Sequence, residues 1–365
     1  MSRAFHRYSI FTLFVGVLLI WWGAAVTTED VGLAVPDWPL CFGKINPEGW
    51  YRVPALLLEH GHRWIATTIG FLVLGQYFWV FSRHQPNVTE AGVLILTGIG
   101  YLVLVYMGQL IVAGLILVLG FAWLIMTWLA RRWHLLRGLT TLALLLVILQ
   151  ASLGGLRVLK MSNAYGIVHG TLGQLFYCLL ILIAFASSRT WEEGQLRLSA
   201  TTARKARIWS LGLFLCVFTQ LVIGATLRHT QRDHLAASDI ITTKGLLIPP
   251  PAPADVFVLF LHKYWGVMTA GLLVYVAVQA HRWLVTLPKL RAVPVLLLYL
   301  PVIQVTLGIF VILTGKSFWI TNFHVLNGLG LLAMSFLLAS TIWGSFLRTP
   351  DAVLAEATQP AHADG

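Results

Sequence analysis

The sequence predicts an all-α integral membrane protein with about ten transmembrane helices, arranged as two pseudo-symmetric four-helix bundles with a helical hairpin inserted in the first half. Its 365 residues are 58% hydrophobic and only 11% charged, with a mean hydropathy of +0.80. Uncharged runs of about 20 residues recur along the chain, and that length crosses a hydrocarbon core of about 30 Å. Motifs of the first half also return in the second half, which is typical of duplicated membrane bundles.

The apolar runs define the candidate helices in order. They cover residues 9–27, 55–81, 91–130, 138–159, 165–187, 208–227, 255–280, 292–314 and 319–345. The first run is long for a signal peptide and no clear cleavage site precedes Glu29, so we expect a retained helix. The third run holds 40 uncharged residues, which as one helix would be about 60 Å long. We therefore predict two spans there, joined by a turn near Met107-Gly108-Gln109.

Lysine and arginine residues lie mostly between the apolar runs. With the N-terminus inside, 15 of the 25 basic residues fall on the inner side and 10 on the outer side. Because cytoplasmic loops carry more positive charge, this bias places both termini on the cytoplasmic side of the cell (inner) membrane. The long outer loops are then 28–54 and 228–254. The net charge of +11 reflects the basic loops, so nucleic-acid binding is excluded.

An internal repeat divides the chain into halves. "QASLGGLRVL" at 150–159 matches "QVTLGIFVIL" at 304–313 with an offset of 154, and "HRWIATTIG" at 62–70 resembles "HKYWGVMTAG" at 262–271 with an offset of 200. The difference of about 46 residues matches the insertion at 91–130 with its connectors. The expected parts are a first half at 1–187, a cytoplasmic linker at 188–207, a second half at 208–345 and a polar tail at 346–365.

The repeat pairs four histidines, one on the second and one on the last helix of each half. They are His62 and His169 in the first half, and His262 and His324 in the second. All four lie four to eight residues inside the outer end of their helix, so we expect them at one depth. A single such histidine is as often a hydrogen-bonded core residue as a ligand. Four at matched depth predict a functional site, because burying histidine in lipid is costly.

Two facing imidazoles can bind zinc, copper or haem iron. Zinc and copper usually take further cysteine, histidine or carboxylate ligands, and the second half has Leu259 where the first half has Glu59. Haem needs one or two axial ligands and an apolar slot between helices, which the 32 glycines and 12% aromatic residues suit. Basic residues near the outer ends could meet haem propionates or could snorkel to the interface. They are Arg63, Arg157, Arg228 and Lys263.

The motifs "TTEDVGLAVPDWPLCFG" (27–43), "EHGHR" (59–63), "QASLGGLRV" and "VHGTLGQ" resemble those of the haem A synthase family, of the CtaA/Cox15 type. The resemblance spans roughly residues 9–345 and is more specific in the first half. It implies a membrane enzyme of eight helices in two related halves, which oxidises a ring methyl group of haem O to a formyl group. The product, haem A, serves haem–copper terminal oxidases.

The resemblance also implies roles for the histidines. His62 and His169 would form the substrate-haem site, with Arg63 beside them, and would ligate the iron of haem O. His262 and His324 would ligate the iron of a haem B cofactor. The partners implied are the lipid bilayer, a haem O synthase, cytochrome oxidase assembly factors and an unidentified electron donor.

Three features depart from that family. Many bacterial members have a cysteine pair in the first outer loop, whereas this chain has only Cys41 there, so a loop disulfide within the chain is excluded. The other two cysteines lie inside apolar runs, at Cys178 and Cys216. The hairpin at 91–130 raises the helix number from eight to ten. The second outer loop lacks a clear copy of the DWPLC motif.

Glu59 matches the acid that the family keeps beside its first histidine. Glu59 and His62 are three residues apart and share a helix face, whereas His60 points elsewhere. A carboxylate there could orient the ligand, relay protons or position a substrate carbon, so Glu59 is the candidate catalytic residue. The structural alternative is an acid that satisfies free amides at the start of a helix.

Two other functions would use similar features. A di-haem electron-transfer protein of the cytochrome b type would use the same bis-histidine pairs, but it would need neither Glu59 nor the DWPLC loop. A transporter built from repeats would place charges near the membrane midplane, whereas the polar groups here lie toward the outer end.

Overall fold

The computed structural model describes residues 2–83, 88–131, 134–193, 196, 198–230, 239–251 and 254–348. Within these residues, nine helices are long and apolar enough to cross a membrane. A tenth helix, α4 (Leu110–Arg131), adds the shorter apolar segment Val112–Thr127. These helices confirm the predicted all-α, multi-pass membrane fold.

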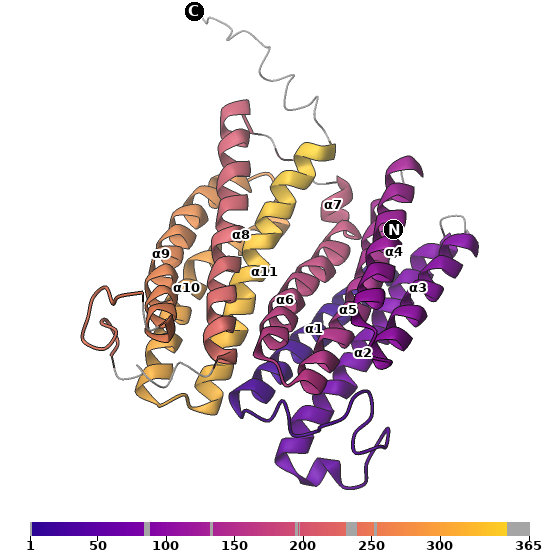
Figure 1. Ribbon diagram of the computed structural model, residues 1–365. Helices are drawn as coiled ribbons and strands as arrows, with labels where there is room; N and C mark the ends of the chain where they lie inside the picture. Colours follow the sequence, from indigo (N-terminus) through magenta and orange to yellow (C-terminus); the bar gives the residue numbers. More distant parts are fainter. Residues whose placement is uncertain are drawn as a thin grey trace, which may run out of the picture. The chain divides into compact units, whose positions relative to one another are not determined.

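The chain separates into two compact units, Met1–Ser187 and Ser188–Gly365. The first unit is built around four helices, which are α1 (Arg3–Thr28), α2 (Pro54–Arg83), α5 (Leu135–Lys160) and α6 (Asn163–Ala186). Helix α1 packs on α2 and α6, and α5 packs on the same two helices (Figure 1). The four helices therefore close into a ring in which α2 and α6 are diagonally opposite.

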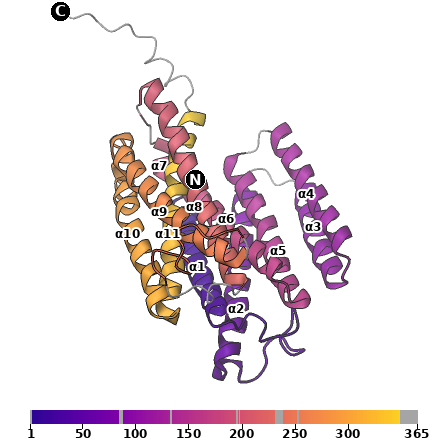
Figure 2. The ribbon, with the colours of Figure 1, turned by 60° about the vertical axis from the view of Figure 1, so that its left-hand side comes forward.

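The predicted hairpin stands beside this ring. Helix α3 (Val88–Tyr106) packs on α4 and on α5, and Figure 2 shows α3 and α4 at the side of the bundle. The chain turns between them at 107–109, where Gly108 has a φ of 75° that favours glycine. The 40-residue apolar run is thus two antiparallel helices, as its length required.

The second unit repeats the ring. It consists of α8 (Ala200–His229), α9 (Ala254–Trp283), α10 (Ala292–Leu313) and α11 (Phe318–Arg348). Helix α8 packs on α9 and α11, and α10 packs on the same two helices (Figure 1). Here α9 and α11 are the diagonal pair, in the same relation as α2 and α6.

One boundary differs from the sequence interpretation, because α8 begins before the expected start of the second half at 208. The stretch expected as a linker, 188–207, contains α7 (Arg189–Glu193) and the first turns of α8. Helix α8 begins at Ala200 because the hydroxyl of Ser199 accepts a hydrogen bond from the amide of Thr202, so the helix starts before its apolar run. Most of the expected tail, 349–365, lies outside the described residues.

Candidate functional site

Each unit brings its two predicted histidines together across the centre of its bundle. His62 on α2 and His169 on α6 have ring centroids 6.5 Å apart, with 85° between the ring planes. His262 on α9 and His324 on α11 have ring centroids 6.3 Å apart, with 61° between the planes. Both pairs join diagonally opposite helices, so each pair spans the interior of a four-helix ring.

The Cε1 edge of each imidazole lies against a glycine on a neighbouring helix. A Cβ atom added to Gly23 would lie 2.9 Å from Cε1 of His62, and one at Gly154 would lie 3.3 Å from Cε1 of His169. The corresponding distances in the second unit, from Gly224 to His262 and from Gly308 to His324, are 3.0 and 3.2 Å. We call these four glycines the glycine seats. Any larger side chain would push its histidine away from the partner ring.

The spacing within each pair fits two axial ligands on one haem iron. A metal–imidazole bond is about 2.0 Å long, and the ring centre lies roughly 1.1 Å beyond the nitrogen, so two imidazoles on opposite sides of one metal hold their centres about 6.2 Å apart. The observed distances are 6.5 and 6.3 Å. Among the described residues, no group of three or more His, Cys, Asp or Glu side chains could hold a metal ion.

Glu59 is buried one helical turn before His62, with 4% of its surface exposed. Its Oε2 accepts a hydrogen bond from the amide of Ala34 at 3.1 Å, and its Oε1 accepts one from Arg63 at 2.8 Å. The carboxylate therefore ties the first outer loop to α2 directly above the histidine. The second unit has the buried, apolar Leu259 at this position.

Arg63 fastens the same loop. Its Nη1 donates to the carbonyl oxygens of Asp37 at 2.9 Å and Leu40 at 2.8 Å, while Nη2 donates to Glu59. These contacts anchor the loop to α2, and the contact of Arg63 with a haem propionate stays a prediction. In the second unit Lys263 does the same, because its Nζ donates to the carbonyl oxygens of Asp239 and Thr242 at 2.5 and 2.9 Å.

The two outer loops contain one and the same turn. In the first, the amides of Phe42 and Gly43 donate to the carboxylate of Asp37 at 2.8 and 2.7 Å, and Cys41 and Lys44 form a two-residue bridge. These amide hydrogen bonds outweigh the effect of burial and lower the pKa of Asp37.

In the second loop the amide of Gly245 donates to Asp239 at 2.8 Å, and Thr243 and Leu246 form the bridge. Both turns place two residues in the left-handed region, with φ of 50° and 72° in the first and 52° and 75° in the second. The second loop therefore repeats the turn of the first loop, although it has no clear copy of the DWPLC sequence, as expected.

Cys41 occupies a buried position within its turn and corresponds to the buried Thr243. Burial raises the pKa of the Cys41 thiol, which keeps it protonated at neutral pH. Cys41, Cys178 and Cys216 are all free in the described part of the chain.

Two arginines stand near the histidine pairs. Arg157, at the end of α5, packs its guanidinium over Gly32 and lies within electrostatic reach of His62 and His169. Arg228, at the end of α8, reaches His324 in the same way. Arg63 and Lys263 likewise lie within electrostatic reach of His62 and His262, so all four basic residues singled out in the sequence lie near a histidine pair.

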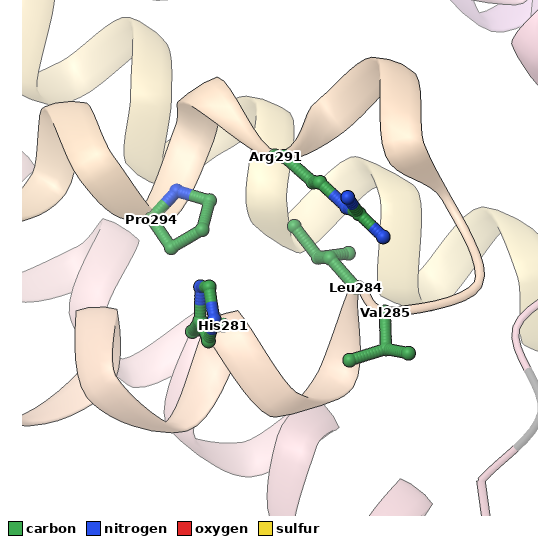
Figure 3. Close-up of a pocket in the computed structure, with 5 residues that line it drawn as sticks. All are labelled: His281, Leu284, Val285, Arg291 and Pro294. Carbon is green, nitrogen blue, oxygen red and sulfur yellow. The ribbon is translucent and has the colours of Figure 1, made fainter.

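Two further features lie away from the pairs. His60 points to another side of α2, where its Nε2 accepts a hydrogen bond from the indole of Trp64 at 3.0 Å. A hollow lined by His281, Leu284, Val285, Arg291 and Pro294 lies at the opposite end of α9 from His262 (Figure 3). None of the predicted site residues lines it.

Known proteins resemble this chain along most of its length. The family model COX15-CtaA, described as cytochrome oxidase assembly protein, matches residues 104–336, which include His169, His262 and His324. A protein of Halalkalibacterium halodurans named Heme A synthase is 23% identical over 331 residues, which cover 89% of this chain and 93% of that protein. A protein of Bacillus pumilus with the same name is 29% identical over 236 residues, covering 63% of this chain and 61% of that protein.

Proposed function

This chain belongs to the COX15-CtaA family of cytochrome oxidase assembly proteins, and from that premise and the site geometry we propose that it is a haem A synthase. It is a multi-pass membrane enzyme that converts haem O to haem A, by oxidising a ring methyl group to a formyl group. The observation that carries the proposal is the presence of two similar histidine pairs and, among the described residues, of a buried acid one helical turn before the first histidine of the first pair, where the second pair has Leu259.

The two histidine pairs bind different haems. His62 and His169 hold haem O as substrate, and His262 and His324 hold haem B as the resident cofactor. Haem B supplies one-electron chemistry when it is bound. The protein would contribute the histidines that hold the haems, the glycine seats beside their rings, and a first outer loop that is fastened to α2 through Glu59 and Arg63.

Glu59 serves the oxidation step. As a carboxylate it holds the loop through Ala34 and Arg63, and it can take up a proton at Oε1 or Oε2 on the face of α2 that also carries His62. Leu259 can do neither, so the second pair lacks a proton acceptor at this position. This difference also disfavours a di-haem electron-transfer protein, which would need no such acid at either pair.

The protein lies in the cell (inner) membrane with both termini in the cytoplasm, according to the positive-inside rule. A haem O synthase would supply its substrate, and cytochrome oxidase assembly factors would receive haem A. An unidentified electron donor would serve the site formed by His262 and His324.

The function is tested by expressing the chain in cells that make haem O and lack any other haem A synthase. Extracted haems are then separated and identified by mass. We expect haem A, with its formyl group, in the wild type, and haem O without haem A when Glu59 is replaced by Gln. Removal of a positioned acid–base group lowers rates by about 10²–10⁴-fold. If the wild type binds two haems and yields no formyl haem, the electron-transfer function is supported instead.

Arg63→Ala separates catalysis from loop anchoring. It removes the contacts to Asp37, Leu40 and Glu59, while Glu59 keeps its carboxylate and its hydrogen bond from the amide of Ala34. If Glu59 acts only by holding the loop, Arg63→Ala lowers haem A as much as Glu59→Gln does. If Glu59 moves a proton, Glu59→Gln has the larger effect.

A further inference from the structure

The inserted hairpin is packed against the first outer loop. Near the turn between α3 and α4, four buried side chains form a cluster, which consists of Tyr101, Val105, Ala113 and Leu117. The partly buried indole of Trp38 packs against this cluster, although Trp38 belongs to the first outer loop. The hairpin, which follows α2 in the chain, is thus in contact with the loop that precedes α2.

Trp38 also contacts α5. A Cβ atom added to Gly155 on α5 would lie 2.6 Å from Cε2 of the indole, so only glycine leaves room for this ring. Gly155 directly follows Gly154, which is the glycine seat of His169. The side chain of Trp38 is therefore held by α5 and by the hairpin together.

The main chain on either side of Trp38 fastens the loop to α2. The carbonyl oxygens of Asp37 and Leu40 accept hydrogen bonds from Arg63 at 2.9 and 2.8 Å. Arg63 in turn donates to the carboxylate of Glu59 at 2.8 Å. A displaced Trp38 would move the two carbonyl groups that hold Arg63, and the surroundings of Glu59 would change with them.

The second unit lacks this arrangement in its described residues. Its outer turn has Ile240 at the position of Trp38, with 43% of its surface exposed, and α10 has Ile309 at the position of Gly155. The chain passes from α9 to α10 through the short helix η3 (Pro288–Leu290), without a hairpin. The tryptophan, the glycine and the hairpin are thus combined at the histidine pair that has the buried acid.

We propose that the inserted hairpin is a positioning element for the reaction, which holds Trp38 against α5 and so keeps the first outer loop in place on Arg63 and Glu59. The proposal rests on the proposed function, because it takes Glu59 to serve the oxidation of haem O. Trp38 is then a positioning residue, since it acts on Glu59 through the loop. Loss of the contact between the hairpin and Trp38 loosens the loop and slows the reaction without releasing either haem.

Two leucines on α4 give a matched pair of variants. Leu117 belongs to the cluster beside Trp38, whereas Leu124, on the same helix, belongs to a separate cluster with Tyr77 and Leu145. The two leucines are 6% and 4% exposed, so a change to alanine creates a similar cavity at either position. Leu117→Ala therefore disturbs the hairpin beside the loop, and Leu124→Ala disturbs it away from the loop.

The thiol of Cys41 measures how firmly the loop is held. Cys41 is 1% exposed within the turn that Asp37 binds, so it reacts with N-ethylmaleimide only when the loop opens. Alkylation of Cys41 in purified protein is followed by mass spectrometry, which requires neither haem nor turnover. From the same preparations the haems are extracted, and the ratio of haem A to haem O and the total haem per protein are measured.

Leu117→Ala should speed the alkylation of Cys41 by at least about tenfold, because a cavity beside Trp38 makes opening of the loop easier. It should also lower the ratio of haem A to haem O at unchanged total haem. Leu124→Ala should leave both within about twofold of the wild type, since distant sites act independently. Trp38→Ala should behave like Leu117→Ala, and Trp38→Phe should restore most of the wild-type behaviour because an aromatic ring remains.

Equal alkylation rates in Leu117→Ala and Leu124→Ala would overturn the proposal. Faster alkylation in Leu117→Ala with an unchanged haem ratio would also overturn it, because the loop would then be held without positioning the reaction. If Leu117→Ala failed to fold, a Trp38→Ala protein that matched the wild type in both measurements would have the same meaning. A wild type that yields no haem A, with faster alkylation in Leu117→Ala alone, would instead contradict the proposed function.

Discussion

At the scale of the residue, the histidine pairs depend on glycines that the sequence does not single out. Histidine is rare enough for its repeat to be visible in the sequence. The two rings of each predicted pair lie close together, as expected. Glycine is common in membrane helices, so Gly23, Gly154, Gly224 and Gly308 stand out only when their distances to the rings are known. The matching offsets of the glycines and histidines are a signal that could have found them.

The glycine seats can be tested on a single helix. Gly224→Val should expel the ring of His262 and weaken haem B binding by about five- to hundredfold, corresponding to an overpacking cost of about 1–3 kcal/mol. Gly212→Val on the same α8 is the control, because no described atom lies within 4 Å of a Cβ there. The ratio of haem B to purified protein is the measurement. Equal ratios in the two variants would show that the seat is unimportant.

Cys41 gives a second prediction at this scale. Because it corresponds to Thr243 and its thiol is buried and protonated, Cys41→Thr should keep haem A production within about twofold of the wild type, as expected of a conservative change without a named destabilising mechanism. Haem extraction after matched expression checks this. A loss of haem A in a folded Cys41→Thr protein would assign redox chemistry to the thiol.

At the scale of the element, the two outer turns show what a sequence comparison misses. The segments 37–44 and 239–246 share only an aspartate and a glycine at matching positions. Those two residues suffice, since the aspartate binds the turn amides and the glycine takes the positive φ. The other positions differ because they face different surroundings, so the motif could be predicted only in the first loop.

The inserted hairpin is fastened by a buried ion pair between Glu90 on α3 and Arg137 on α5, and the guanidinium also lies 5.8 Å from the ring centroid of Phe81. Glu90→Ala removes the carboxylate that pairs with a largely buried arginine and should lower the free energy of unfolding by about 3–5 kcal/mol.

Thermal unfolding in detergent measures the effect of this ion pair. The double variant Glu90→Leu/Arg137→Leu is the control, and it should regain most of the lost stability because no charge remains buried. A single variant as stable as the wild type would mean that the ion pair does not fasten the hairpin.

At the scale of the whole molecule, hydropathy and length predict the membrane helices well, because both are dictated by the bilayer. Ten apolar spans were expected, and the described residues contain nine candidate spans and one shorter apolar helix. Helix ends are less predictable, as α8 shows, since capping residues extend helices beyond the hydrocarbon. The surroundings of each histidine pair could not be predicted either, because they depend on contacts between helices that lie far apart in sequence.

The orientation of the chain is a separate prediction at this scale. Ile45 and Ile248 are exposed in the two outer loops, and Lys289 is exposed between α9 and α10. In a background without the natural cysteines, a membrane-impermeant maleimide should label Ile45→Cys and Ile248→Cys in intact cells. Lys289→Cys should be labelled only after the cells are opened. The reverse pattern would place the N-terminus outside.

The central claim is that the first pair holds the substrate and the second pair holds the cofactor. Haem analysis of purified wild type, His62→Ala and His262→Ala tests it most directly. We expect His262→Ala to lose haem B selectively, and His62→Ala to keep haem B while haem A falls to the detection limit. Equal loss of haem B from both variants would contradict the division of work between the two pairs.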